Sequence, residues 1–231
     1  MPLLVRTWNL FHGRTKPPSG RTHLERMIRL ISEDDPDLVA LQEVPAWALG
    51  RLGHWSRMEE AGGVARPARL GHLGRRLTQL APDVFRSLFN GQANALLLGR
   101  DVRPVEAART VEIKPRGVLE RRVCQLVRVA AGGRTLLLAN LHATAHVPEL
   151  ARAELVRVAE LVAGDEPAIV CGDFNVRATG LPGFSKPNHG IDQIIVRGLR
   201  FERGPARWPP ERRRFEGRLL SDHAPVEAVI A

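Results

Sequence analysis

Apolar runs of strand length recur along this sequence, and they constrain the fold more than any other feature. Runs rich in Val, Ile and Leu that are bounded by turn-forming residues predict strands. Such runs span residues 2–8, 37–44, 94–99, 121–130, 134–143, 167–175, 190–196 and 224–230. Between residues 94 and 143 the strands follow one another without a helical segment. This order argues against regular strand–helix alternation and predicts an α/β fold of the α+β type, with antiparallel sheets covered by a few helices.

Two segments show the spacing of a helix that buries one face. They are residues 23–34 and residues 148–164, where apolar side chains recur every three or four positions. Residues 66–90 are rich in Arg and Leu, and we expect them to be helical or irregular. No Pro-, Gly- or Ser-rich linker divides the chain, so we predict a single domain over residues 1–231.

The composition is that of a globular protein, with 44% hydrophobic and 26% charged residues. No apolar run reaches the roughly 20 residues of a membrane span, and the N-terminus lacks the pattern of a signal peptide. We therefore expect a cytoplasmic protein, monomeric and without a membrane partner. Cys124 and Cys171 lie in apolar runs without metal-ligand spacing, so we expect buried thiols rather than a disulfide or a zinc site.

The chain is basic, with a formal net charge of +9. This balance favours an acidic partner such as nucleic acid or a phosphorylated small molecule. Only three of the 34 basic residues are lysines, and such a bias toward Arg also arises from a GC-rich genome or a solvated surface. The densest basic cluster, residues 209–218, is expected to form an exposed loop.

Polar side chains interrupt the predicted strands repeatedly, at or next to their ends. In a layered sheet fold such ends converge on one rim, where clefts form. Each occurrence alone also fits a cap, a turn or a satisfied buried amide, and Gly172–Asn175 is itself a sequence of turn formers. The residues concerned are Asn9, Gln42, Glu43, Asn94, Asn140, His142, Asp173, Asn175, Asp192, Asp222 and His223.

This set of side chains suits the hydrolysis of a phosphoester. The carboxylates of Glu43, Asp173 and Asp222, with the carbonyl oxygen of Asn9, are ligands of the kind that Mg²⁺ prefers. A pairing of Asp192 with His223 would orient the imidazole to remove a proton from water. The side chains of Asn140, His142 and Asn175 would hold phosphoryl oxygens as charge develops. Together these parts predict metal-assisted attack of water on phosphorus.

The motifs that carry these residues resemble those of the endonuclease/exonuclease/phosphatase superfamily, which includes deoxyribonuclease I. The matching stretches are TWN, LQEV, NLH, GDFN, IDQIIV and SDHAPV, and they span residues 7–226. The resemblance implies a four-layer α/β sandwich like that of deoxyribonuclease I. In such a sandwich two packed, mostly antiparallel sheets are flanked by helices. It also implies phosphoester hydrolysis dependent on a divalent metal, Mg²⁺ or Mn²⁺.

The resemblance also implies a role for each residue. Glu43 is then the main metal ligand, with Asn9 and Asp222 nearby. His223 is the general base paired with Asp192, while Asp173 and Asn175 position the nucleophile and the phosphate. His142 contacts the phosphate or assists the leaving group. The motifs are compatible with either His223 or Asp173 as the group that activates the water.

The substrate is the least constrained part of the prediction. The favoured function is a nuclease, an endonuclease or exonuclease that cleaves phosphodiester bonds. The alternative is a phosphodiesterase or phosphatase acting on a small molecule or lipid, and the least favoured is a catalytically idle binding protein. Arg14 and His12 follow Asn9 closely and are candidates for phosphate binding, although a solvated loop fits them too. Asn94 is a further candidate for substrate binding. Basic residues gathered around Glu43 and His223 would favour nucleic acid.

Overall fold

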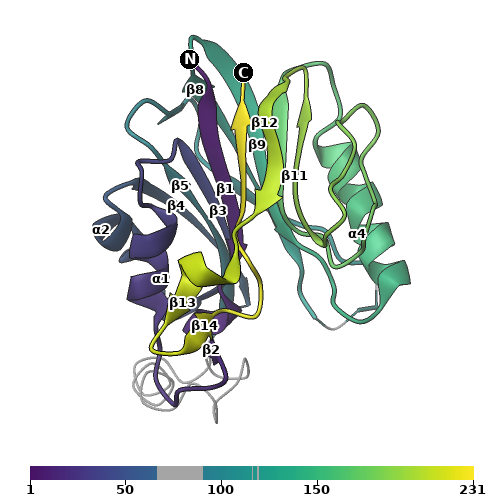
Figure 1. Cartoon of the computed structure of the whole chain (residues 1–231). Coiled ribbons are helices and arrows are strands. Elements are labelled where there is room, and N and C mark those ends of the chain that lie inside the picture. The colour runs from purple at the N-terminus through teal and green to yellow at the C-terminus, as the bar shows by residue number, and fades with distance from the viewer. Residues whose placement is uncertain (67–90, 116, 119) are drawn as a thin grey trace.

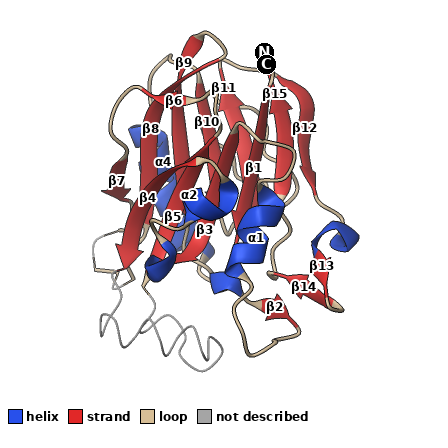
Figure 2. Ribbon diagram, turned by 90° about the vertical axis from the view of Figure 1, so that its left-hand side faces the viewer, coloured by secondary structure: helices blue, strands red, loops and turns tan. Residues whose placement is uncertain are grey.

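The computed structural model describes residues 1–66, 91–115, 117–118 and 120–231, and the side chains of residues 64–66 are not described. Two large sheets pack face to face, with helices on their outer sides (Figures 1 and 2). Residues 67–90, which belong to the segment expected to be helical or irregular, lie outside the described residues. In the described part, no helix combines the length and the apolar character needed to cross a bilayer.

The first sheet has the strand order β12-β15-β1-β3-β5-β4 and is antiparallel except between β1 and β3. Its strands are β12 (Phe201–Arg207), β15 (Val226–Ile230), β1 (Leu3–Asn9), β3 (Leu38–Pro45), β5 (Gln92–Leu98) and β4 (Glu59–Arg66).

The second sheet has the order β11-β10-β9-β8-β6, with β7 also paired to β8, and is antiparallel except between β9 and β10. Its strands are β11 (Asp192–Arg197), β10 (Ala168–Asp173), β9 (Arg134–His142), β8 (Val123–Ala131), β6 (Arg103–Pro104) and β7 (Arg109–Glu112).

The remaining elements cover the sheets or extend from them. The helices are α1 (Leu24–Ile31), α2 (Leu52–Ser56) and α4 (Pro148–Leu161), and the short 3-10 turns are η1 (Phe11–Gly13), η2 (Ala46–Ala48) and η3 (Pro210–Arg213). A small third sheet joins β13 (Arg214–Phe215), β14 (Arg218–Leu220) and β2 (Thr15–Lys16). Figure 1 shows α1 and α2 on one side of the sheets and α4 on the other.

Three apolar clusters separate the four layers of this sandwich. One fills the space between the sheets, one lies between the first sheet and α1 with α2, and one lies between the second sheet and α4. Alternate residues of β3 show the division, because Leu38 and Ala40 face the other sheet while Val39 and Leu41 face the helices. Both faces of the central strands are buried, which explains why their sequences are continuously apolar rather than alternating.

The predicted fold class and the predicted strands are confirmed, while some exposed elements were not predicted. Strand β12 has mostly exposed side chains, so it lacks the apolar run by which the eight predicted strands were recognised. Strand β4 and the short strands β2, β6, β7, β13 and β14 were also not predicted. Residues 209–218 are mostly exposed, as predicted, but they form η3, β13 and part of β14 rather than a loop, and Arg213 among them is buried. Both cysteines are free and buried, as expected.

Candidate active site

The two termini lie together at one end of the sandwich, since Leu3 pairs with Ile230, and the polar strand ends lie at the other. In the second sheet, the ladder aligns three of these residues across neighbouring strands. Asp173 at the end of β10 pairs with His142 at the end of β9 and with Asp192 at the start of β11. Strand register therefore places an imidazole and two carboxylates side by side.

The first sheet contributes Glu43 through an irregularity in β3. The register with β5 shifts between Leu41 and Val44, and Glu43 takes a left-handed backbone conformation with φ of +51°. A bulge of this kind re-aims the side chains around it. A left-handed backbone at a residue other than glycine costs about 1–3 kcal/mol and persists where the surrounding structure enforces it. Here it coincides with the carboxylate predicted as the main metal ligand.

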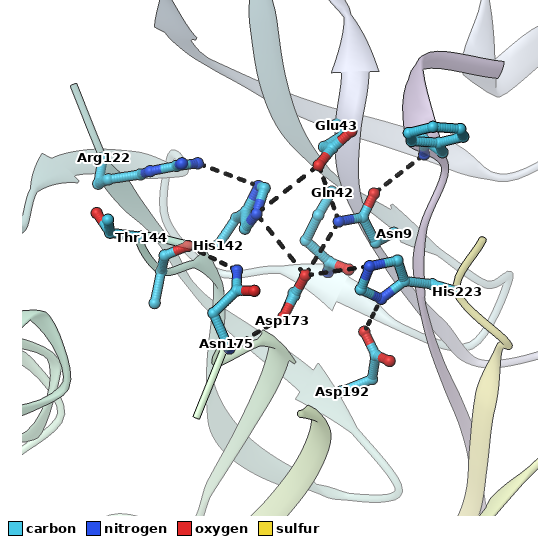
Figure 3. A network of polar contacts seen from close by, with 12 residues as sticks. Asn9, Gln42, Glu43, Arg122, His142, Thr144, Asp173, Asn175, Asp192 and His223 are labelled. Carbon is cyan, nitrogen blue, oxygen red and sulfur yellow. Dashed lines mark hydrogen bonds and ion pairs between the residues drawn. The ribbon is translucent and has the colours of Figure 1, made fainter. Parts of the chain in front are cut away.

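Asn9 joins the two sheets at the site (Figure 3). Its Nδ2 donates to Glu43 Oε1 and to Asp173 Oδ2, at 3.1 Å each. Its Oδ1 accepts the backbone N–H of Phe11 at 3.0 Å, and because a backbone N–H can only donate, this contact fixes the orientation of the amide. The Asn9 oxygen is thus directed to the backbone. That hydrogen bond uses one of the two lone pairs of the oxygen, so ligation of a cation by Asn9 stays a prediction, while the amide nitrogen bridges the two carboxylates.

The GDFN stretch, residues 172–175, forms a turn and also supplies polar groups to the site, so both interpretations of its sequence hold. Gly172 has φ of +141°, and a Cβ there would lie 2.0 Å from the carbonyl oxygen of Leu141, so this position requires glycine. The chain then turns, with Asn175 N donating to Asp173 Oδ1 at 3.0 Å and Asn175 at φ of +52°. Asn175 Nδ2 donates to the carbonyl of Ala143 at 2.8 Å, while Phe174 is buried against α4's layer.

His223 and Asp192 form the predicted pair. His223 Nδ1 lies 2.9 Å from Asp192 Oδ1, and its Nε2 lies 3.7 Å from Asp173 Oδ2. The turn that carries His223 is held by the indole N–H of Trp8, which donates to the His223 carbonyl at 2.9 Å. Ser221 supports the same turn, because its hydroxyl donates to the Asn9 carbonyl and accepts the His223 N–H.

The electrostatics of the site perturb three groups. Burial, together with the negative charge of Asp192, raises the pKa of Asp173 to about 7. Burial by itself lowers the pKa of His223, but the hydrogen bond and charge of Asp192, with the charges of Asp173 and Asp222, raise it to about 9. Burial and the neighbouring Arg122 hold the pKa of His142 well below its ordinary value. Such shifts gather at functional sites more often than elsewhere.

His142 lies between the two sheets' acidic groups and two residues that sequence reasoning missed. Its Nε2 is 3.8 Å from Glu43 Oε1 and 3.7 Å from Asp173 Oδ2. Its Nδ1 contacts Gln92 Nε2 at 2.8 Å and Arg122 Nη1 at 3.4 Å. Gln92 and Arg122 belong to no recognised motif, and the only signal was a polar residue at the edge of a predicted strand.

Two predicted phosphate-binding amides lie elsewhere. Asn140 is fully buried, and its Nδ2 donates to the carbonyls of Leu41 and Ala95 while its Oδ1 accepts from Gln42. Asn94 is buried as well and donates to the carbonyl of Val123 at 3.1 Å. Both side chains tie one sheet to the other inside the sandwich, because these bonds satisfy backbone carbonyls that packing removes from water.

The other predicted residues surround the centre. His12 Nε2 lies 3.3 Å from Glu43 Oε2, so His12 stands beside the predicted metal ligand. Arg14 is buried, with its guanidinium 4.7 Å from the centre of the Phe11 ring. Asp222 Oδ2 lies 3.4 Å from Lys16 Nζ, while its Oδ1 is buried and has no hydrogen-bond partner among the described residues.

The donor atoms fit a hard divalent cation. Within the described residues, one group of potential ligands has its donor atoms within 4.8 Å of one another, and it consists of Asp173, Asp192 and His223. Glu43 and Asp222 stand outside that group. The orphaned Asp222 oxygen is an atom of the type that a cation or its water shell satisfies. Carboxylate oxygens are ligands of the kind that a divalent cation accepts.

Solved structures share the overall fold of this chain. One of them is an endonuclease/exonuclease/phosphatase from Beutenbergia cavernae. The structural alignment covers 99% of this chain and 71% of that protein, with 17% identity and a TM-score of 0.75. It also resembles a functionally unknown conserved protein from Enterococcus faecalis (17% identity, 99% of each chain, TM-score 0.75). A third structure is the human Nocturnin catalytic domain with bound sulfate (16% identity, 100% and 94% of the chains, TM-score 0.71).

At these identities the solved structures show the fold alone, and no curated protein matches the sequence. The family model for Endonuclease/Exonuclease/phosphatase, however, matches residues 7–223, nearly the whole chain. The chain therefore belongs to the endonuclease/exonuclease/phosphatase family, a family of phosphoester hydrolases that depend on a divalent metal.

Proposed function

We propose that this protein is a nuclease that hydrolyses phosphodiester bonds with the help of Mg²⁺ or Mn²⁺. The observation that carries the proposal is the Asp192–His223 pair, at 2.9 Å, whose free imidazole nitrogen faces the buried carboxylate of Asp173. A carboxylate–imidazole pair beside a second, perturbed carboxylate is an arrangement for moving protons at neutral pH.

In this proposal Asp173 accepts the proton of the attacking water. A base with a pKa near 7 is best matched to neutral pH, and the pKa of Asp173 is raised to about 7. His223, with its pKa raised to about 9 by Asp192, is then the charged partner. Its Nε2–H points to the Asp173 side of the site and donates to a phosphoryl oxygen.

Glu43 and Asp222 are the residues proposed to hold the cation, because Asp173 and His223 are engaged in proton transfer. A bound divalent cation supplies Lewis-acid stabilisation of the charge that develops on the phosphoryl oxygens. Asn9 orients Glu43 and Asp173 relative to each other through its two hydrogen bonds. One amide therefore couples the proposed metal ligand to the proposed base.

Basic groups close to the site support a nucleic-acid substrate. Lys16 lies 3.4 Å from Asp222, and Arg207 lies 4.0 Å from Asp192. Both cationic side chains are exposed, so they can hold a phosphate that flanks the scissile bond.

A small phosphodiester is the second candidate, because part of the basic excess lies far from the site. Arg103, Arg134 and Arg200 are exposed at the opposite end of the sandwich, near the termini. Charge placed there does not guide a polymer to the catalytic centre, and the fold hosts both kinds of chemistry.

The test is hydrolysis of plasmid DNA, single-stranded RNA and bis-p-nitrophenyl phosphate by the purified protein in Mg²⁺. Asp173→Asn and His223→Ala are the inactivating variants, and Arg103→Ala is the matched remote control. Cleavage of DNA or RNA that EDTA and both site variants abolish supports the nuclease. Turnover of the small diester alone replaces it with the second candidate, and hydrolysis that survives in both variants overturns the site.

A further inference from the structure

The environment of His142 determines which of its ring nitrogens carries the proton. In a neutral imidazole one nitrogen donates and the other accepts, and a hydrogen-bond partner at one nitrogen decides the tautomer. Nδ1 of His142 faces Gln92 Nε2 at 2.8 Å and Arg122 Nη1 at 3.4 Å. The ring is buried, so these contacts are not exchanged for water.

Arg122 decides the assignment where Gln92 alone cannot. A glutamine amide can present either its oxygen or its nitrogen to a neighbour, so Gln92 fits either tautomer. A guanidinium has only donors, so a ring nitrogen that faces it favourably must be an acceptor. With Arg122 against Nδ1, the lone pair belongs to Nδ1, Gln92 presents its amino group, and the proton lies on Nε2.

Arg122 is placed in this position despite an unfavourable environment. Its side chain is only 8% exposed, its ion pair is with the exposed Glu120 at 3.1 Å, and its Nε has no hydrogen-bond partner among the described residues. Burying a guanidinium that is incompletely paired is costly, so packing alone does not account for an arginine here. The contact of Arg122 with His142 Nδ1 is consistent with a role in orienting the imidazole.

The opposite nitrogen points to the proposed reaction centre (Figure 3). Nε2 lies 3.8 Å from Glu43 Oε1 and 3.7 Å from Asp173 Oδ2, too far for a hydrogen bond to either oxygen. These are the same two oxygens that Asn9 bridges. The Nε2–H is therefore aimed between the proposed metal ligand and the proposed base.

We propose that Gln92 and Arg122 are positioning residues that hold His142 as its Nε2–H tautomer, so that it donates a hydrogen bond to the phosphoryl group during hydrolysis. The catalytic part of this inference rests on the proposed function, whereas the tautomer is a property of the protein itself. A carboxylate in place of Gln92 would pair with the guanidinium of Arg122, draw it away from Nδ1 and accept from Nδ1–H, which reverses the arrangement. Residues 92 and 122 together thus set whether His142 offers a donor or a lone pair to the site.

The experiment compares the wild type with Gln92→Glu, Arg122→Met and Arg122→Lys. Nitrogen-15 NMR of histidine-labelled protein without added metal reports the tautomer of His142, assigned by its loss in His142→Gln. Hydrolysis of bis-p-nitrophenyl phosphate gives kcat and KM, and circular dichroism verifies the fold of each variant. Gln92→Glu keeps the size of the side chain and replaces the amide donor by a negatively charged acceptor, so it serves if Arg122→Met fails to fold.

We expect the Nε2–H tautomer in the wild type and the Nδ1–H tautomer in Gln92→Glu. We expect kcat to fall at least about tenfold in Gln92→Glu and Arg122→Met, with KM within about twofold, and to recover in Arg122→Lys to within about threefold of the wild type. A wild-type Nδ1–H tautomer, or an unchanged tautomer in Gln92→Glu, overturns the proposal. Equal losses of kcat in Arg122→Lys and Arg122→Met would show that Arg122 is not a positioning residue. If the wild type hydrolyses nothing, the proposed function fails while the NMR result still decides the tautomer.

Discussion

The second sheet supplies its share of the active site through strand register, whereas the first sheet does so through departures from regular structure. Asp192, Asp173 and His142 occupy matched positions on three neighbouring strands. Glu43 instead sits at a bulge, and the turn after Asn9 has left-handed backbone at Phe11 and His12, with φ of +47° and +54°.

Because of this difference, substitutions in the two sheets are expected to act in different ways. Register is fixed by every bond of a sheet, so a side-chain change at Asp192 alters the chemistry while leaving the strands in place. A bulge or turn is a local solution that neighbouring side chains enforce, so changes near Glu43 also alter position.

Asp192→Asn is expected to have the largest effect on activity. The carboxylate orients His223 and raises its pKa, so the amide leaves an imidazole with the wrong hydrogen-bond partner. We expect kcat to fall about 1,000-fold or more, with little change in the urea midpoint of unfolding. The exposed Asp165→Asn is the matched control. Comparable activity in the two variants would contradict the assigned role of the pair.

Gly172→Ala is expected to have the largest effect on stability. An added Cβ would lie 2.0 Å from the Leu141 carbonyl oxygen, in a backbone conformation that alanine avoids. We expect a loss of about 3 kcal/mol or more in the free energy of unfolding, measured by urea denaturation. Gly133→Ala is the control, because φ is +79° there but nothing lies within 4 Å, so only about 1 kcal/mol is expected. Equal losses in the free energy of unfolding would show that β10 can move away from β9 at Gly172 without further cost.

Asn9→Ala is expected to shift the pH dependence of hydrolysis. Asp173 must be deprotonated to accept a proton and His223 protonated to donate one, so wild-type activity should rise through about pH 7 and fall through about pH 9. The Asn9 hydrogen bond lowers the pKa of Asp173, so its removal moves the acid limb upward, by about one unit. An unmoved acid limb would show that Asn9 does not act on Asp173.

Arg128→Ala, remote from both parts of the site, is expected to have the smallest effect. Its guanidinium holds both oxygens of Glu166, at 2.8 and 2.9 Å, on a partly exposed surface. We expect a loss of about 0.5 kcal/mol in the free energy of unfolding at pH 7, and unchanged kcat. The bond lowers the folded-state pKa of Glu166, so the contribution is present above the unfolded pKa and disappears as the pH falls through the folded one. Denaturation curves at pH 7 and below about pH 4 test this sign.

The layers of the fold, and the proximity of the polar residues in the second sheet, could be predicted because both follow from the distribution of apolar and polar residues along the strands. Continuous apolar runs mark strands buried on both faces, and a polar residue at the end of such a run marks the rim. Asp173, Asp192 and His142 were found in this way and lie together.

The sequence does not show how deep a polar strand end lies or which way its atoms point. Asn140 and Asn94 had the same signal as Asp173, yet their amides join the sheets inside the sandwich. The orientation of Asn9 depends on the Phe11 amide, which a turn of left-handed residues brings within reach. Arg122 was missed because an arginine in an Arg-rich chain carries no distinguishing signal.

A double-mutant cycle across the two sheets tests most directly whether they form one catalytic centre. Glu43→Gln changes the first sheet's contribution and Asp192→Asn the second's, with kcat/KM for Mg²⁺-dependent diester hydrolysis as the measurement. If the two sheets form one catalytic centre, each single variant loses about 1,000-fold or more and the double variant loses no more than about tenfold beyond either. Near-wild-type activity in either single variant, or losses that multiply in full, would contradict a single centre built from both sheets.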